Sequence, residues 1–280
     1  MQVFVNEKAI KNRIEYLKAK GKTIGFVPTM GALHEGHISL VRESKKMCDI
    51  TVVSIFVNPV QFDNKDDLKK YPRTIESDKI KLKKAGVDIL FFPTEDVIYP
   101  PGLDTGVNLD LEGLDEKWEG AFRPGHFAGV VRVVKRLLDI VEPDCLFMGQ
   151  KDFQQFTIIK MMLEKLDIPV RLIVVPIFRE KDGLAMSSRN VRLSPDFRQK
   201  STVLYKMLKY AKKHFNDKEI EQIENYALEQ IKSAGLKPEY FKIVDTKTLE
   251  PVKNGTADTD AVAIVAAWAG DVRLIDNMIL

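Results

Sequence analysis

Short apolar runs alternate with amphipathic helical patterns over the first 176 residues of the chain. The run at 49–57 is too rich in β-branched residues for a comfortable helix, which favours a strand. The apolar runs together predict strands at 22–28, 49–57, 88–92, 145–148 and 170–176. The intervening patterns predict helices at 36–48, 74–85 and 153–166, and one through 130–141 whose apolar residues recur at i, i+3 and i+4. This alternation predicts a doubly wound parallel sheet of the α/β class, like that of a Rossmann fold.

The pattern changes after Pro176, where a polar, glycine-containing segment begins. Beyond it the sequence predicts two helices, at about 195–215 and 218–234, and then short strands at 240–245, 261–267 and 273–276. Helices followed by strands are typical of an α+β domain. We therefore expect a Rossmann-like domain at 1–176 and a smaller α+β domain at 177–280. The tract 99–125 is rich in Gly and Pro and is predicted to be an irregular loop.

Composition narrows the class of protein. A length of 280 residues with 45% hydrophobic and 30% charged residues fits two globular domains. A net charge of +3 is too small to indicate a nucleic-acid surface. Cys48 and Cys145 form no CxxC pattern, which argues against a zinc site and favours a reducing compartment. No signal-like or membrane-length apolar run occurs, so we expect a soluble cytoplasmic protein.

The segment FVPTMGALHEGH, residues 26–37, is the most informative for function. It places a strand, a turn containing Gly31, and then His34 and His37 at the start of a helix. The carboxyl end of a strand next to a helix N-terminus is the usual anion-binding crevice of an α/β sheet. The spacing is one residue short of the H-E-x-x-H zinc motif. One alternative is that the glycines merely shape a turn and that the histidines are surface or core residues without a chemical role. We favour the interpretation that the two imidazoles donate hydrogen bonds to phosphate oxygens.

Two other predicted strands end in polar segments. In VNPVQF, residues 57–62, the amide of Gln61 can both donate and accept, which suits a hydroxy acid. In GQKDFQQF, residues 149–156, Lys151 offers a charge for phosphate and Asp152 an acceptor for ribose hydroxyls. Taken alone, Gln61 would be an ordinary loop residue and Asp152 a helix cap.

A fourth segment, GLAMSSRN at residues 183–190, follows the predicted domain boundary. Its two hydroxyls, its backbone N–H groups and Arg189 form a plausible cradle for a pyrophosphate-like anion, although a solvated loop would also explain them. Chance explains any one of the four segments better than all four together.

These segments resemble those of the pantothenate synthetase family, nearly end to end. The matching segments are PTMGALHEGH, FVNPVQF, YPRT at 71–74, RPGHFAGV at 123–130, GQKDFQQ and DGLAMSSRN, in the family's order and approximate spacing. HxGH alone would indicate only the wider nucleotidyltransferase superfamily. The resemblance implies a Rossmann-like N-terminal domain, a smaller C-terminal domain and a homodimer.

The resemblance also implies a reaction, that of an AMP-forming pantoate–β-alanine ligase. The carboxylate of (R)-pantoate attacks the α-phosphate of Mg²⁺-ATP, giving pantoyl-adenylate and diphosphate. The amine of β-alanine then attacks the acyl carbon and releases AMP and pantothenate. The implied partners are these small molecules, with Mg²⁺ accompanying ATP, no tightly bound organic cofactor, no nucleic acid and no membrane.

Carried onto matching positions, the resemblance gives roles to individual residues. It implies His37, His34 and Lys151 as catalytic residues, and no direct metal ligand. It implies Gln61 and Gln155 as pantoate-binding residues. The implied ATP-binding residues are Met30, Gly31, Ala32, Leu33, His34, Glu35, Gly36, His37, Gly149, Gln150, Lys151, Asp152, Phe178, Met186, Ser187, Ser188 and Arg189.

Three positions depart from the family pattern. Gln150 stands where the family usually has Glu, Phe178 where it has a smaller aliphatic residue, and Arg132 where it commonly has threonine. Two other classes stay open from the residues alone. A nucleotidyltransferase acting on a phosphorylated acceptor would not need two glutamines facing a hydroxy acid, and a regulatory module would not need the catalytic set. Length and charge disfavour a tRNA synthetase.

Overall fold

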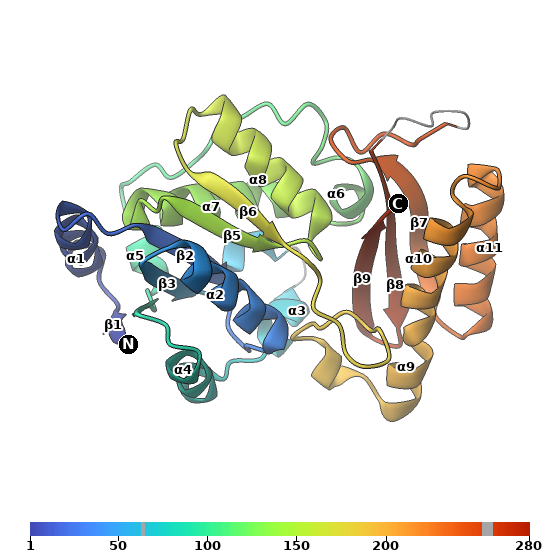
Figure 1. Ribbon diagram of the computed structural model, residues 1–280, viewed down its shortest axis with the longest axis horizontal. Coiled ribbons are helices and arrows are strands. Elements are labelled where there is room, and N and C mark those ends of the chain that lie inside the picture. The colour runs from blue at the N-terminus through green and yellow to red at the C-terminus, as the bar shows by residue number, and fades with distance from the viewer. Residues whose placement is uncertain (63–64, 254–259) are drawn as a thin grey trace. The chain divides into compact units, whose positions relative to one another are not determined.

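The computed structural model describes residues 1–62, 65–253 and 260–280. The chain divides into two compact units (Figure 1). The first unit comprises residues 1–116, 120–149 and 155–176, and the second comprises 117–119, 150–154 and 177–280.

The first unit is built on a parallel sheet. Its strands are β1 (Gln2–Phe4), β2 (Ile24–Thr29), β3 (Ile50–Ile55), β4 (Ile89–Phe91), β5 (Cys145–Gly149) and β6 (Arg171–Val175). Within the described residues the sheet has the order β1-β4-β3-β2-β5-β6, with every pair parallel. The chain moves outward from β2 to β3 and β4 and then returns to β5 on the other side of β2. This reversal is the switch point of a doubly wound sheet, so the predicted α/β fold is confirmed.

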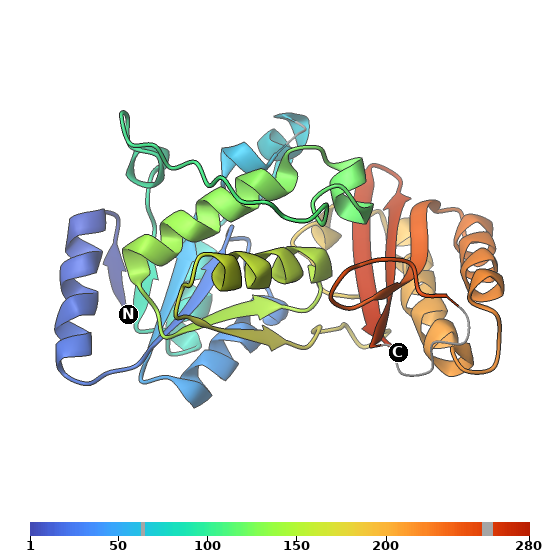
Figure 2. The same cartoon turned by 90° about the horizontal axis from the view of Figure 1, so that it is seen from above.

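Helices cover both faces of this sheet. They are α1 (Glu7–Ala19), α2 (Glu35–Met47), α3 (Lys65–Lys70), α4 (Ile75–Lys84), α5 (Glu95–Ile98), α7 (His126–Val141) and α8 (Phe153–Lys165), with the 3₁₀ turn η1 (Pro59–Gln61). Helix α2 lies on one face, and α7 and α8 lie on the opposite face (Figure 2). Fully buried Val27, Val53, Leu90 and Phe147 form part of the core between the sheet and its helices. Burial on both faces explains why these strands read as continuous apolar runs.

The second unit has an antiparallel sheet of the order β7-β8-β9, with strands β7 (Lys237–Asp245), β8 (Ala261–Ala269) and β9 (Val272–Ile279). Its helices are α9 (Pro195–Lys200), α10 (Thr202–His214) and α11 (Ile220–Ser233), and η2 (Asn190–Arg192) is a 3₁₀ turn. Buried Leu208, Ile223, Phe241 and Val265 belong to its core, which confirms the smaller α+β fold.

Two short segments from the first part of the sequence are fastened to the second unit. Arg273 of β9 donates to both carboxylate oxygens of Glu119, at 2.8 and 2.6 Å. The hydroxyl of Tyr240 donates to the same carboxylate at 2.6 Å. The side chain of Gln154 accepts from the N–H of Glu119 and donates to the carbonyl of Lys117. These bonds explain why 117–119 and 150–154 belong to this unit.

Several sequence predictions need correction. The N-terminal strand β1 and helix α1 were not expected, although Asn6 accepts from the N–H of Ala9 as an ordinary N-cap. The tract 99–125, expected to be irregular, contains helix α6 (Trp118–Phe122). The helix predicted at 195–215 is two helices, which meet at the fully buried Ser201.

Candidate active site

The turn after β2 is held in shape by a buried carboxylate. Gly31 and Ala32 have φ values of 83° and 50°, in the left-handed region. Asp78 of α4, 1% exposed, accepts from the N–H groups of Ala32 and Leu33 at 2.9 Å each. A Cβ on Gly31 would lie 3.0 Å from the side chain of Ile55, so both space and backbone angle call for glycine here. The left-handed Ala32 is stabilised by the charged acceptor opposite its N–H.

His34 and His37 cap the N-terminus of α2. Nδ1 of His34 accepts from the N–H of Gly36 at 3.1 Å, and Nδ1 of His37 accepts from the N–H of His34 at 3.3 Å. The two ring centroids are 4.1 Å apart. A backbone N–H can only donate, so both Nδ1 atoms carry a lone pair and each neutral ring has its hydrogen on Nε2. The arrangement is a capping box in which histidines take the usual places of Ser and Glu.

The segment after β3 carries Gln61, which is 8% exposed. Its amide oxygen accepts from Nδ2 of Asn58 at 3.1 Å, and its amide nitrogen donates to Sδ of Met30 at 3.2 Å. Gln61 and Met30, two of the residues that the family resemblance singles out, are therefore in direct contact at the carboxyl ends of neighbouring strands.

The N-terminal half of α7 supports this segment. Nδ1 of His126 lies 2.8 Å from the carbonyl oxygen of Gln61, and its Nε2 lies 3.0 Å from a guanidinium nitrogen of Arg123. The guanidinium can only donate and the carbonyl can only accept, which fixes a neutral His126 with its hydrogen on Nδ1. A Cβ on Gly129 would lie 2.7 Å from the carbonyl of Val60, so a larger residue cannot fit between α7 and this turn.

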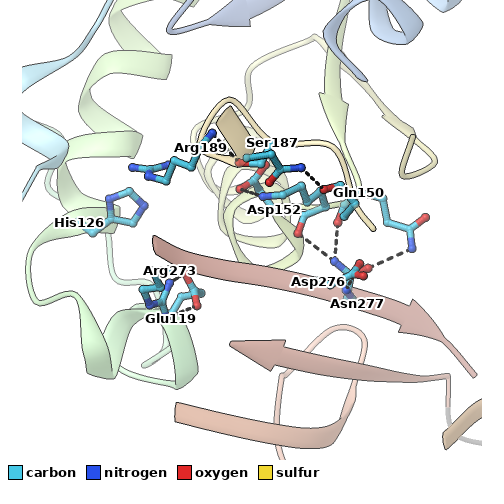
Figure 3. Close-up of polar contacts among 12 residues, drawn as sticks. Glu119, His126, Gln150, Asp152, Ser187, Arg189, Arg273, Asp276 and Asn277 are labelled. Carbon is cyan, nitrogen blue, oxygen red and sulfur yellow. Dashed lines mark hydrogen bonds and ion pairs between the residues drawn. The ribbon is translucent and has the colours of Figure 1, made fainter. Parts of the chain in front are cut away.

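In the second unit, Asn277 of β9 holds the segment that contains Lys151 (Figure 3). Its side-chain Nδ2 donates to the carbonyls of Gln150 and Lys151, at 2.9 Å each. Its Oδ1 accepts from the amide of Gln150 at 3.1 Å. Glutamine at position 150 supplies to this oxygen a donor that an ionised carboxylate would lack.

The neighbouring Asp276 anchors the loop that leads to Arg189. Its carboxylate, 4% exposed, accepts two bonds from the guanidinium of Arg179, at 2.6 and 2.9 Å. Burial raises the pKa of Asp276, and the Arg179 guanidinium opposes that rise. Arg179 also donates to the carbonyl of Gly183 and stacks on Tyr205, 4.4 Å from the ring centroid.

The loop itself is internally bonded. The N–H of Met186 donates to the carbonyl of Phe178 at 3.0 Å, and the N–H of Arg189 donates to Oγ of Ser187 at 3.2 Å. Arg198 pairs with Asp182, and this hydrogen bond lowers the pKa of that carboxyl against the opposing effect of burial. Beside this loop lies Asp152 (Figure 3). These hydrogen bonds hold the hydroxyl and N–H groups of the loop in defined positions.

The predicted site residues thus fall into two groups, one in each unit. Residues 30–37, Gln61, Gly149 and Gln155 lie in the first unit. Gln150, Lys151, Asp152, Phe178 and residues 186–189 lie in the second. The amino group of Lys151 is 3.7 Å from the Asp152 carboxylate, and Phe178 is 36% exposed. Gln155 is half-buried on the first turn of α8.

Sequence reasoning gave no positioning role to the residues that hold these groups in place. The residues concerned are Asn58, Asp78, His126, Asp276 and Asn277. Their contacts with the site span 3 to 127 positions of sequence, so no local pattern joins most of them to it. Two contacts are local: Asn58 lies three positions before Gln61, and His34 and His37 have the N-cap to N3 spacing of a capping box.

The described part of the chain contains no cluster of three or more His, Cys, Asp or Glu residues suited to holding a metal ion. No helix among the same residues is both long enough and apolar enough to cross a membrane.

A doubly wound sheet with a glycine turn and two donor histidines at a helix start defines a nucleotide-binding α/β protein of the HxGH type. Residues 2–279 match the family described as pantoate-beta-alanine ligase, and the chain belongs to that family. It is 46% identical to the pantothenate synthetase of Vibrio parahaemolyticus, over 99% of this chain and 92% of the relative. It is 45% identical to that of Christiangramia forsetii, over 100% and 99%.

Solved structures agree with this assignment. The pantothenate synthetase of Thermus thermophilus has a TM-score of 0.92 at 38% identity, with 99% of each chain covered. The pantoate-beta-alanine ligase of Francisella tularensis, in complex with beta-gamma ATP and β-alanine, has a TM-score of 0.83 at 36% identity, covering 100% of this chain and 97% of that one. Family membership excludes the regulatory module and the transfer of AMP to a phosphorylated acceptor as the main activity.

Proposed function

We propose that this ligase joins pantoate to β-alanine by way of a pantoyl-adenylate, with ATP as co-substrate. Family membership over residues 2–279 carries the proposal. The ligands named for the Francisella relative support ATP and β-alanine as two of the substrates. The pair of Nε2–H donors at the start of α2 supplies a physical reason, since adenylation builds negative charge on phosphate oxygens.

In the proposed first step, a carboxylate oxygen of pantoate attacks the α-phosphorus and the bond to the β-phosphate breaks. His34 and His37 donate to the oxygens that gain charge, without having to transfer a proton. Lys151, Ser187 and Arg189 hold the diphosphate as it leaves. The amides of Gln61 and Gln155 hold the pantoate hydroxyls.

In the proposed second step, the β-alanine amine attacks the acyl carbon of the adenylate. The new C–N bond forms, the bond to AMP breaks, and the amine gives up a proton. No cysteine or serine paired with a base is needed, because the nucleotide itself carries the acyl group. Residues 186–189 would shield the adenylate from water while this happens.

Mg²⁺ enters the proposal as the ion that accompanies the ATP phosphates and neutralises part of their charge. We assign Asp78 no direct bond to the ion, because the chain already engages its carboxylate. Its carboxylate accepts from the N–H groups of Ala32 and Leu33, and from the hydroxyl of Thr74 at 3.2 Å. The triphosphate would therefore bring the ion to the site. A cytoplasmic location, expected from the sequence, and a homodimer, implied by the family resemblance, belong to the same proposal. Sedimentation at several concentrations tests the dimer.

Isotope exchange tests the order of the two steps. Labelled diphosphate should exchange into ATP when pantoate is present and β-alanine is absent, because adenylation is reversible and needs no amine. It should not exchange with β-alanine alone. A requirement for both substrates would exclude a separate adenylation step and leave a concerted reaction.

An Asn277→Ala variant tests the role of the 150–152 segment in binding ATP. Asn277 makes three hydrogen bonds to Gln150 and Lys151, so its loss should raise the KM for ATP by about tenfold, as expected for one to two net hydrogen bonds. The KM for pantoate should change much less. Asn12→Ala, on the exposed surface of α1, is the control. Equal changes in both KM values would contradict an ATP-specific role.

A further inference from the structure

A continuous line of contacts in the first unit runs from Arg132 of α7 to Gln61. We propose that Arg132 and Tyr99 are positioning residues that make Gln61 present its amide N–H, rather than its carbonyl, to a pantoate oxygen. The inference rests on the proposed role of Gln61 in binding pantoate, and it specifies which end of the Gln61 amide contacts pantoate. It also assigns a function to Arg132, which the family pattern leaves unexplained.

The direction follows from Asn58, which is 1% exposed. The N–H of Val60 points to its Oδ1 at 3.4 Å, and its Nδ2 lies 3.1 Å from the carbonyl oxygen of Gly129. One backbone partner can only donate and the other can only accept, so together they fix which side of the Asn58 amide is nitrogen. That nitrogen also faces Gln61, at 3.1 Å. The atom of Gln61 that meets it must therefore be the carbonyl oxygen.

The other side of the Gln61 amide is consequently its nitrogen. It points to Sδ of Met30 at 3.2 Å. A thioether is a weak acceptor, so a carboxylate or hydroxyl oxygen of the substrate can take its place at little cost. A hydroxy acid offers such oxygens, and a site that donates to them distinguishes it from an analogue without them.

Tyr99 completes the arrangement around Asn58. Its hydroxyl lies 2.8 Å from Oδ1 of Asn58 and must donate, because that oxygen has no hydrogen. Burial raises the pKa of Tyr99 to about 12, and so the hydroxyl keeps its proton at neutral pH. This bond is shorter than the one from Val60, which makes Tyr99 the stronger of the two donors that orient Asn58.

Arg132 restrains Tyr99. The guanidinium carbon lies 4.5 Å from the centroid of the Tyr99 ring, a cation–π distance. Its Nε donates to the hydroxyl of Thr105 at 2.8 Å, which fixes the guanidinium in that position. A threonine at position 132 would be too short to cover the ring. The chain of effects therefore runs from Arg132 through Tyr99 and Asn58 to Gln61.

Steady-state kinetics of Tyr99→Phe, Arg132→Met and the double variant test this inference. Tyr99→Phe should raise the KM for pantoate about fivefold to tenfold, as expected for one net hydrogen bond. Arg132→Met should raise it about twofold to fivefold, as expected for a partly exposed cation–π contact. The double variant should resemble Tyr99→Phe alone, because Arg132 acts through Tyr99. The KM for ATP should stay within twofold of the wild type, roughly the error of additivity.

The chain supplies a matched control on α1. There the guanidinium of Arg13 lies 5.3 Å from the ring centroid of Tyr16, with Tyr16 54% exposed. Arg13→Met and Tyr16→Phe remove the same groups away from Asn58 and should leave the KM for pantoate unchanged. A purely structural role for Arg132 would instead lower the melting temperature and raise both substrate KM values together, and that result would overturn the inference.

A Gln61→Glu variant tests the direction of the hydrogen bond. Glutamate keeps the acceptor and loses the donor, so it should bind pantoate no better than Gln61→Met. Near-normal pantoate binding by Gln61→Glu would overturn the inference. Failure of the proposed function is recognised separately, since the wild type would then show no pantoate-dependent exchange of diphosphate into ATP.

Discussion

A His37→Ala variant is expected to adenylate pantoate at least roughly a hundredfold more slowly than the wild type, the usual effect of losing a preorganised donor. The backbone N–H of His34 fixes the hydrogen of His37 on Nε2. In the proposed reaction the ring would therefore meet the phosphate as a neutral donor that needs no reorganisation. The effect should appear in the rate of the chemical step more than in the affinity for ATP.

A His37→Gln variant separates catalysis from capping. Glutamine at the N3 position can accept the N–H of His34 through its oxygen and donate through its nitrogen. It should therefore preserve the start of α2 and adenylate faster than the alanine variant. His214→Ala is the control for removing an imidazole from another part of the chain. The His214 ring packs against Tyr210 on α10 and has no proposed role in the reaction.

Rapid-quench single turnover with ATP and pantoate, in the absence of β-alanine, measures the step directly. Circular dichroism establishes that each variant is folded. A folded His37→Ala protein with a near-normal single-turnover rate would contradict the proposed role of His37.

The sequence predicted most of the first unit because its signals are local. Strands β2, β3 and β5 are buried on both faces and read as short apolar runs. The start of α2 was placed within one residue, at Gly36 instead of Glu35. Histidine is not a preferred N-cap, and so the capping role of His34 could not be inferred from residue preference.

The supports of the candidate site could not be predicted in the same way. Asp78 reaches Ala32 across 46 positions of sequence, and Asn277 reaches Gln150 across 127. Each of these residues lies in an ordinary helix or strand pattern, and only tertiary packing brings it to the turn that it stabilises. Arg132 is similar, because periodicity placed it on the polar face of its helix and could not show Tyr99 beside it.

An Asp78→Ala variant is expected to lose about 3–6 kcal/mol of unfolding free energy, from the two backbone N–H bonds to a buried charged acceptor alone. The N–H groups of Ala32 and Leu33 would both lose the Asp78 carboxylate as their acceptor. The left-handed backbone of Ala32 would lose this stabilisation, and the turn before His34 would relax. Adenylation should therefore fall together with stability.

Asp78→Asn provides the finer test because it keeps the size of the side chain. One amide oxygen can serve one of the two N–H groups, while the amide nitrogen faces the other donor, so the loss should be about 1.5–3 kcal/mol. Glu76→Gln on the same helix, with a side chain 80% exposed, should stay within about 0.5 kcal/mol of the wild type. Urea denaturation followed by circular dichroism measures all three variants. Wild-type stability in Asp78→Asn would mean that one acceptor suffices, whereas wild-type stability in Asp78→Ala would show that the carboxylate does not hold the turn.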